Sequence, residues 1–128
     1  MGPGMTSDEL KERTANFVRR IIKTVDALPK TVSGKTIAGQ LVRSGTSVVA
    51  NYRASLRSRS KAEFVSKIGI VIEESDETLF WLDLIIDIEM LPKNKVVLLR
   101  KETEELLAIF CATKTTTKEN LKSVNHKL

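Results

Sequence analysis

The sequence predicts an all-α protein, an antiparallel up-down-up-down bundle of four helices. Apolar residues recur at spacings of three, four and seven along four successive segments, as they do on one face of a helix. Glycine and proline number only 6 and 3 in 128 residues, which leaves room for long uninterrupted helices. No alternating apolar pattern or Asn-Gly turn indicates a strand, and the short connections favour antiparallel neighbours.

The first helix is expected at about residues 7–28. Thr6 and Glu9 have the spacing of a capping box, in which each side chain bonds the backbone N–H of the other residue. An apolar stripe follows the cap and ends before Pro29. Residues 1–6 are expected to be a flexible leader or an expression remnant, and residues 7–112 to form the bundle.

The second helix is expected after a turn at residues 29–34, and its face carries unusually small residues. Such residues allow a neighbouring helix to approach closely, and close packing in the bundle is favoured over a ligand-binding role. Gly39 and Gly45 each cost this helix roughly 1 kcal/mol relative to alanine, so some packing contact is expected to compensate. The small residues are Ser44, Gly45, Ser47, Ala50 and Ala54.

The third helix is expected at about residues 61–91, opened by a second capping box at Ser60 and Glu63. Eight of the ten residues 79–88 are apolar, so this helix is apolar on more than one face. We expect its second face to be buried against another copy of the chain. The candidate interface residues are Glu73, Glu77, Trp81, Ile85 and Ile88.

A fourth helix is expected after Leu91-Pro92, with Asn94 as its N-cap. Cys111 is expected in the core as a small apolar residue. The polar tail, residues 113–128, is expected to be frayed or disordered.

The charges are segregated along the chain. The net charge is +5, yet residues 27–62 carry seven basic groups and no acid, whereas residues 63–92 carry eight acids and one base. The second and third helices are therefore expected to lie side by side or to meet across a subunit interface.

The arginines and lysines of the second helix and of the turn after it have two possible interpretations. Arginine presents planar donors suited to phosphate oxygens, so these residues are candidates for binding a nucleic-acid backbone. Aromatic residues are only 5% and no base-reading motif is present, which argues against specific base recognition. The alternative is a solvated face, or ion pairs with acids of the third helix at Glu73, Glu74, Asp76 and Glu77. The candidates are Arg43, Arg53, Arg57, Arg59 and Lys61.

Composition also argues against most enzyme chemistry. One histidine, His126, and one cysteine cannot supply a zinc site or a Ser/His/Asp triad. Glu73 and Glu77 lie one turn apart but lack the Glu-x-x-His partners of a di-iron centre. No catalytic residue, metal or cofactor is expected. No charge-free stretch is long enough for a membrane span, and the single cysteine favours the cytoplasm.

Two segments carry a family resemblance. Residues 41–54 (LVRSGTSVVANYRA) and 60–85 (SKAEFVSKIGIVIEESDETLFWLDLI) resemble the bacterial 23S rRNA intervening-sequence proteins. The resemblance implies a four-helix bundle assembled as a homopentameric ring, with no established catalytic residue. A related branch is an accessory to the reverse transcriptase of diversity-generating retroelements and binds nucleic acid. Many members carry a glutamate where this chain has Arg53.

The resemblance also suggests a role for polar residues in helix packing. Asn51 is expected to be buried and to fix helix register, with Ser47 and Ser75 as hydrogen-bonding neighbours; ordinary packing is the alternative. Two functional hypotheses follow. The first is a non-enzymatic ring that binds RNA or DNA backbones without sequence preference. The second is a protein-interaction scaffold, or a reverse-transcriptase accessory, whose charges serve subunit and partner contacts.

Overall fold

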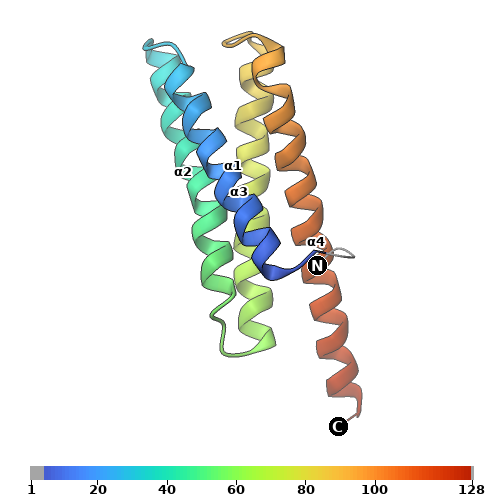
Figure 1. Cartoon of the computed structure of the whole chain (residues 1–128). Helices are drawn as coiled ribbons and strands as arrows, with labels where there is room; N and C mark the ends of the chain where they lie inside the picture. Colours follow the sequence, from blue (N-terminus) through green and yellow to red (C-terminus); the bar gives the residue numbers. More distant parts are fainter. Residues whose placement is uncertain (1–4, 128) are drawn as a thin grey trace.

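A computed structural model describes residues 5–127, with side chains for residues 5–122, and these residues form four α-helices. Consecutive helices run antiparallel and pack side by side, which confirms the predicted all-α bundle (Figure 1). Most of the expected leader, residues 1–4, lies outside the described residues. The helices are α1 (Ser7–Ala27), α2 (Val32–Ser55), α3 (Lys61–Asp87) and α4 (Val97–Lys127), with the 3-10 helix η1 (Lys93–Lys95) before α4.

The helix starts are set by side-chain caps. Thr6 and Glu9 form the predicted capping box, with both N–H···O distances at 3.1 Å. Ser60 caps α3 by accepting from the Glu63 N–H at 3.0 Å. The carboxylate of Glu63, however, accepts from the Arg59 N–H at 2.8 Å rather than from Ser60, so the second capping box forms only in part.

The end of α3 and the start of α4 differ from the expected boundaries. α3 ends at Asp87, and Ile88 serves as its C-cap. Glu89 then adopts a left-handed backbone conformation, φ 54°, which turns the chain away from the helix axis. Asn94 lies inside η1 rather than capping α4.

One face of each helix supplies the core. Tyr52 of α2 and Phe110 of α4 pack with their ring centroids 5.6 Å apart. Ile85 of α3 is 0% exposed inside this core, so its expected place in a subunit interface is wrong: the bundle itself covers it. The largest fully buried side chains are Phe17, Phe110, Leu10, Ile21, Leu41, Ile68, Leu82, Ile85, Leu106, Val48, Val71 and Val96.

Two contacts fix how α2 packs. Ile21 of α1 lies on Gly45, where an added Cβ would approach Ile21 Cγ2 to 2.9 Å, so the missing side chain allows the two helices to approach. Between α2 and α3, the buried Thr78 hydroxyl donates to Ser44 Oγ at 3.0 Å. Gly39 faces open space, and no described residue would lie within 4 Å of a Cβ added there, so no such contact compensates its cost.

The contact between α1 and α4 is the least extensive of those between neighbouring helices. Arg13 of α1 bridges it with a two-pronged bond to Glu102, at 2.8 Å from Nε and 2.7 Å from Nη2. Arg13 Nη2 also donates to Glu105 at 2.7 Å. This charged contact joins α1 and α4 at the least extensive of the helix contacts.

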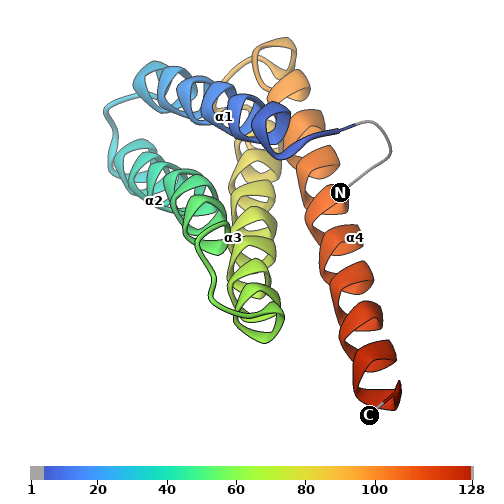
Figure 2. The ribbon, with the colours of Figure 1, turned by 60° about the horizontal axis from the view of Figure 1, so that its bottom comes forward.

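The polar tail differs most from the expectation. α4 continues through residues 113–127 and projects past the other helices (Figure 2). The segment contains no glycine or proline, and the hydroxyls of Thr113 and Thr117 bond the carbonyls four residues earlier at 2.8 Å. Leu121 and the first turn of α3, at Ala62 and Val65, border a common hollow. Within the described part of the chain, no helix is long and apolar enough to cross a membrane.

Candidate nucleic-acid interface

Arg43 is engaged by acids of α3. Its guanidinium lies 3.2 Å from a carboxylate oxygen of Glu74 and also pairs with Glu77. The basic α2 and the acidic α3 thus lie side by side within one chain, as their charges predict. For Arg43 the ion-pair alternative is therefore the better description, and this residue is not free for a phosphate.

The other four candidates behave differently. The four lie from the last turn of α2 to the start of α3, and all are exposed: Arg53 in α2, Arg57 and Arg59 in the connection, and Lys61 at the start of α3. None of the four side chains forms an ion pair with another side chain of residues 5–122. We refer to Arg53, Arg57, Arg59 and Lys61 as the Arg/Lys cluster.

Two members of the cluster line a groove of about 480 Å³ between the start of α1 and the end of α2. Arg53 and Arg57 form one side, and Asp8, Lys11 and Glu12 of α1 lie on the other. Glu12 forms an ion pair with Arg19 at 3.2 Å. Asp8, the other acid of the groove, has no ion pair among the described side chains. Cationic groups therefore outnumber free acids at this groove.

The extended α4 adds lysines that the sequence interpretation missed. Lys114, Lys118 and Lys122 recur every four residues, so they lie along one face of α4. Lys118 and Lys122 border the hollow next to Ala62, one residue after the Arg/Lys cluster. The signal was present in the tail, namely four-residue lysine spacing without a helix breaker, but its polar composition indicated disorder instead.

The expected interface residues of α3 separate into buried and exposed groups. Glu73 is exposed, Glu77 and Trp81 are partly buried, and Ile88 is 47% exposed. Phe80, which was not among the candidates, is 55% exposed and meets Trp81 edge to face with centroids 4.8 Å apart.

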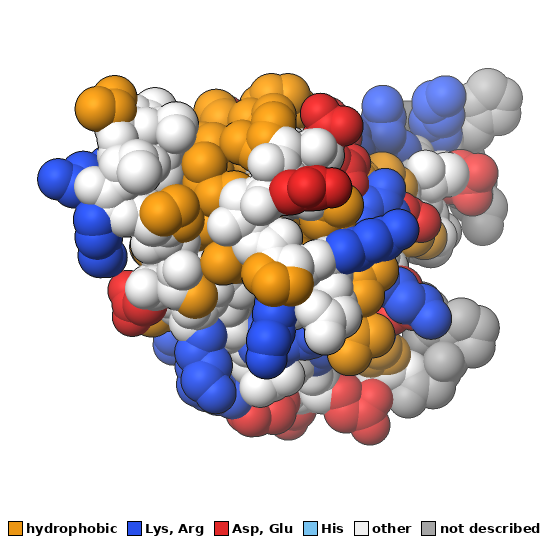
Figure 3. All heavy atoms as spheres, turned by 90° about the horizontal axis from the view of Figure 1, so that it is seen from above, with side chains coloured by type: hydrophobic (Ala, Val, Ile, Leu, Met, Phe, Trp, Pro, Cys, Tyr) orange, Lys and Arg blue, Asp and Glu red, His pale blue; other side chains and the backbone are white. Residues whose placement is uncertain are grey.

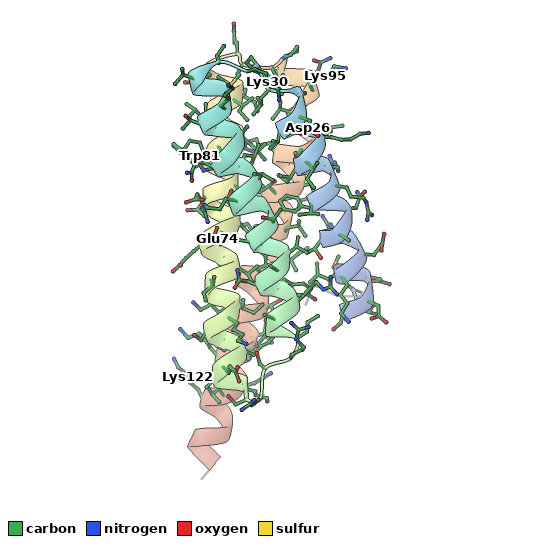
Figure 4. The ribbon with its side chains drawn as sticks, turned by 90° about the vertical axis from the view of Figure 1, so that its left-hand side faces the viewer. Asp26, Lys30, Glu74, Trp81, Lys95 and Lys122 are labelled. Carbon is green, nitrogen blue, oxygen red and sulfur yellow. The ribbon has the colours of Figure 1, made fainter. Side chains whose placement is uncertain are left out.

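These apolar side chains lie toward the end of the bundle that holds the α3–α4 connection. Viewed from that end, hydrophobic side chains gather along one edge of the molecule (Figure 3). Trp81 and Glu74 both lie on the outer edge of α3 (Figure 4). The indole Nε1 of Trp81 is enclosed without an acceptor among the described groups, and such a group requires a partner.

Of the two expected hydrogen-bonding neighbours of Asn51, Ser47 bonds it through its backbone carbonyl, and Ser75 does not bond it. The Asn51 side-chain amide donates to the Ser47 carbonyl at 2.8 Å within α2, and Ser75 Oγ donates to the Val71 carbonyl at 2.8 Å within α3. No hydrogen bond joins Asn51 to Ser75. The buried pair that links α2 to α3 is Ser44 and Thr78, which the sequence interpretation did not select.

The remaining reactive groups do not form a site. Cys111 is exposed on α4, which corrects its expected place in the core. Among the described side chains, no three His, Cys, Asp or Glu residues gather closely enough to hold a metal ion. Burial raises the pKa of Tyr52, whose hydroxyl is enclosed without a hydrogen-bond partner among the described groups.

Comparison with known proteins agrees with the bundle. Residues 8–112 match the family described as 23S rRNA-intervening sequence protein. A crystal structure from Bacteroides thetaiotaomicron, described as a protein with unknown function from the S23 ribosomal protein family, is similar in sequence and fold. It shares 27% identity at a TM-score of 0.76, over 81% of this chain and 96% of that one. No curated protein matches the chain.

Proposed function

Because the chain belongs to the 23S rRNA-intervening sequence protein family, we propose that it is a non-enzymatic bundle that binds RNA or DNA backbones. The Arg/Lys cluster is the binding surface, and the working unit is a homopentameric ring. A bacterial cytoplasm is part of the proposal, since a single unbonded cysteine suits a reducing compartment.

The observation that carries the proposal is the contrast between Arg43 and the Arg/Lys cluster. Arg43 is neutralised by Glu74 and Glu77, whereas the four residues of the cluster stay exposed and unpaired among the described side chains. Arginines crowded together without counter-charges repel one another, and a polyanion relieves that repulsion. Planar guanidinium donors match phosphate oxygens in geometry as well as charge.

A salt-dependent binding titration tests this function. Fluorescence anisotropy with labelled RNA and DNA is expected to show binding that weakens steeply with salt, since each phosphate contact on duplex DNA contributes about −0.9 to the slope of log K against log salt. The variant R53E/R57E/R59E is expected to bind at least about tenfold more weakly at low salt.

The matched control is K30E/K93E/K95E. These three exposed lysines lie at the opposite end of the bundle, where Figure 4 marks Lys30 and Lys95, and the control has the same net charge as the test variant. Equal losses in both variants would mean that net charge alone attracts the nucleic acid. Unchanged binding by R53E/R57E/R59E would reject the Arg/Lys cluster as the surface.

The second candidate is a protein-interaction scaffold, or a reverse-transcriptase accessory protein, in which the same arginines hold subunits or a partner. It is supported by the apolar patch at Phe80, Trp81 and Ile88, because Phe80 and Ile88 are exposed and Trp81 is only partly buried. Light scattering separates the two candidates. If the protein is a scaffold, R53E/R57E/R59E is expected to dissociate the oligomer. If the arginines bind nucleic acid, the oligomer is expected to stay intact.

A further inference from the structure

The extension of α4 carries a row of lysines outside the region that matches the family. Lys114, Lys118 and Lys122, here the lysine row, span roughly 12 Å of one helix face at about 1.5 Å per residue. The family match ends at residue 112. The lysine row therefore lies beyond the matched region.

The lysine row lies against the start of α3, beside the Arg/Lys cluster. An added Cβ at Gly69 would stand 3.3 Å from Lys114 Nζ, so the Lys114 side chain crosses α3 at this glycine. Lys118 and Lys122 reach the first turn of α3 at Ala62 and Val65, and Figure 4 places Lys122 beside that end of α3. The lysine row therefore adjoins the Lys61 end of the Arg/Lys cluster at the start of α3, and we take the two sets of cations together as one basic surface.

Acids are few near these cations in α2, α3 and α4, and Asp8 and Glu12 of α1 lie across the groove from Arg53 and Arg57. Residues 53–67 and 113–122 together hold eight basic groups and two acids, Glu63 and Glu119. Glu63 is engaged by Lys67 at 3.2 Å and by the Arg59 N–H. No member of the lysine row forms an ion pair with a side chain of residues 5–122. The potential of the surface is therefore strongly positive and suits a polyanion.

The surface lacks aromatic platforms. Proteins that hold single strands stack the bases on exposed aromatic rings. Here Tyr52 and Phe110 are buried and Phe64 is partly buried in the same end of the bundle, whereas the exposed Phe80 lies toward the other end of α3. A duplex, whose bases are already stacked, needs only its phosphates to be contacted.

We propose that the lysine row completes the nucleic-acid surface and that its ligand is the backbone of a duplex. The inference rests on the proposed function and adds the ligand class and the contribution of α4. One set of phosphates meets the Arg/Lys cluster while neighbouring phosphates meet the lysine row.

The test compares full-length wild type, K118Q/K122Q, K118E/K122E and the opposite-end control K93E/K95E on a labelled duplex and on its unpaired strand. Wild type is expected to prefer the duplex.

Each lost phosphate contact lowers the salt slope by about 1, so K118Q/K122Q is expected to lower it by up to about 2. K118E/K122E is expected to bind about tenfold or more weakly at low salt, and K93E/K95E like wild type. Circular dichroism checks that the glutamine variant, which keeps helix propensity, retains the extension.

The outcomes separate this inference from the proposed function. Absence of binding by wild type to either ligand overturns both. Binding that depends on Arg53, Arg57 and Arg59 but is the same in wild type, K118Q/K122Q and K118E/K122E overturns the role of the lysine row alone. Tighter binding to the unpaired strand overturns the duplex assignment alone.

Discussion

At the scale of single residues, a buried hydroxyl pair holds α2 and α3 in register. Thr78 Oγ1 lies 3.0 Å from Ser44 Oγ, and both side chains are fully buried. Each hydroxyl also has a carbonyl of its own helix within reach, Glu74 for Thr78 and Leu41 for Ser44. The pair therefore satisfies its hydrogen bonds without water, which lets the two helices pack closely.

Removing one hydroxyl of this pair is expected to destabilise the bundle. T78V should lower the free energy of unfolding by about 1 kcal/mol, because Ser44 loses its buried partner. The double variant S44A/T78V is expected to lose less than the two single variants combined. Urea unfolding measures all three, with T36V, on the exposed face of α2, as the near-neutral control. Simple additivity of the two losses would show that the hydroxyls do not interact.

Among the charged residues, Arg13 is expected to cause the largest loss of stability when it is replaced. Its two-pronged bond to Glu102 raises the pKa of Arg13, and their side chains are only 27% and 14% exposed. R13M keeps much of the packing but leaves Glu102 unpaired, so we expect a loss of about 1.5–3 kcal/mol in unfolding free energy. The control R19M breaks the exposed pair with Glu12 and is expected to cost no more than about 0.5 kcal/mol. Equal losses would contradict the structural role of Arg13.

Glu63 is expected to contribute to acid sensitivity. The Arg59 N–H, and then Lys67, lower the pKa of Glu63 below its ordinary value. A carboxyl with a lowered folded-state pKa stabilises the fold above its unfolded pKa, and this contribution disappears as the pH falls through the folded pKa. E63Q is therefore expected to lose less stability than wild type between about pH 5 and pH 3 in thermal melts. Parallel pH profiles for the two proteins would contradict this assignment.

At the scale of helices, the two glycines of α2 have opposite surroundings. A Cβ at Gly45 would meet Ile21, whereas a Cβ at Gly39 meets nothing within 4 Å. G45A is expected to destabilise the protein by about 1–3 kcal/mol through overpacking. G39A is expected to stabilise the monomer by about 0.5–1 kcal/mol, since alanine favours a helix. Thermal melts compare them, and a loss of stability in G39A would show that another surface covers Gly39.

Helix positions could be predicted from the sequence because apolar spacing and caps are local signals. Thr6 with Glu9 and the stripe up to Pro29 define α1 almost to the residue. The structure differs from the expectation for the tail, because its described residues continue α4, and Thr113 and Leu121 bury part of their side chains, which composition does not report. The prediction that Ile85 lies in a subunit interface was wrong, because spacing along one helix does not say which of its apolar faces packs against the other three helices.

The candidate site could be predicted only in part. The sequence locates the Arg/Lys cluster but cannot tell it apart from Arg43, because pairing with Glu74 and Glu77 depends on how α2 and α3 are aligned. The pairing of Arg13 with Glu102 joins residues 89 positions apart, and no local pattern indicates it.

At the scale of the whole molecule, α3 presents an apolar patch that the bundle leaves partly uncovered. Phe80 and Ile88 are exposed, and Trp81 beside them is partly buried against the core, with its Nε1 lacking an acceptor among the described groups. A second copy packed on this patch would remove apolar area from water at about 25 cal/mol per Å². Repetition of such a contact around an axis gives a closed ring.

F80E is therefore expected to reduce the oligomer to a smaller species in light scattering, because a carboxylate at this position would have to be desolvated in the contact. I22E, at an exposed isoleucine of α1, is the matched control and should leave the mass unchanged. Trp81 is the only tryptophan, so intrinsic fluorescence reports on this patch directly. Dilution of wild type should shift its emission to longer wavelength as the patch meets water, whereas F80E should show that emission at every concentration. An F80E oligomer of wild-type mass, with emission independent of dilution in both proteins, would place the subunit contact elsewhere than on α3.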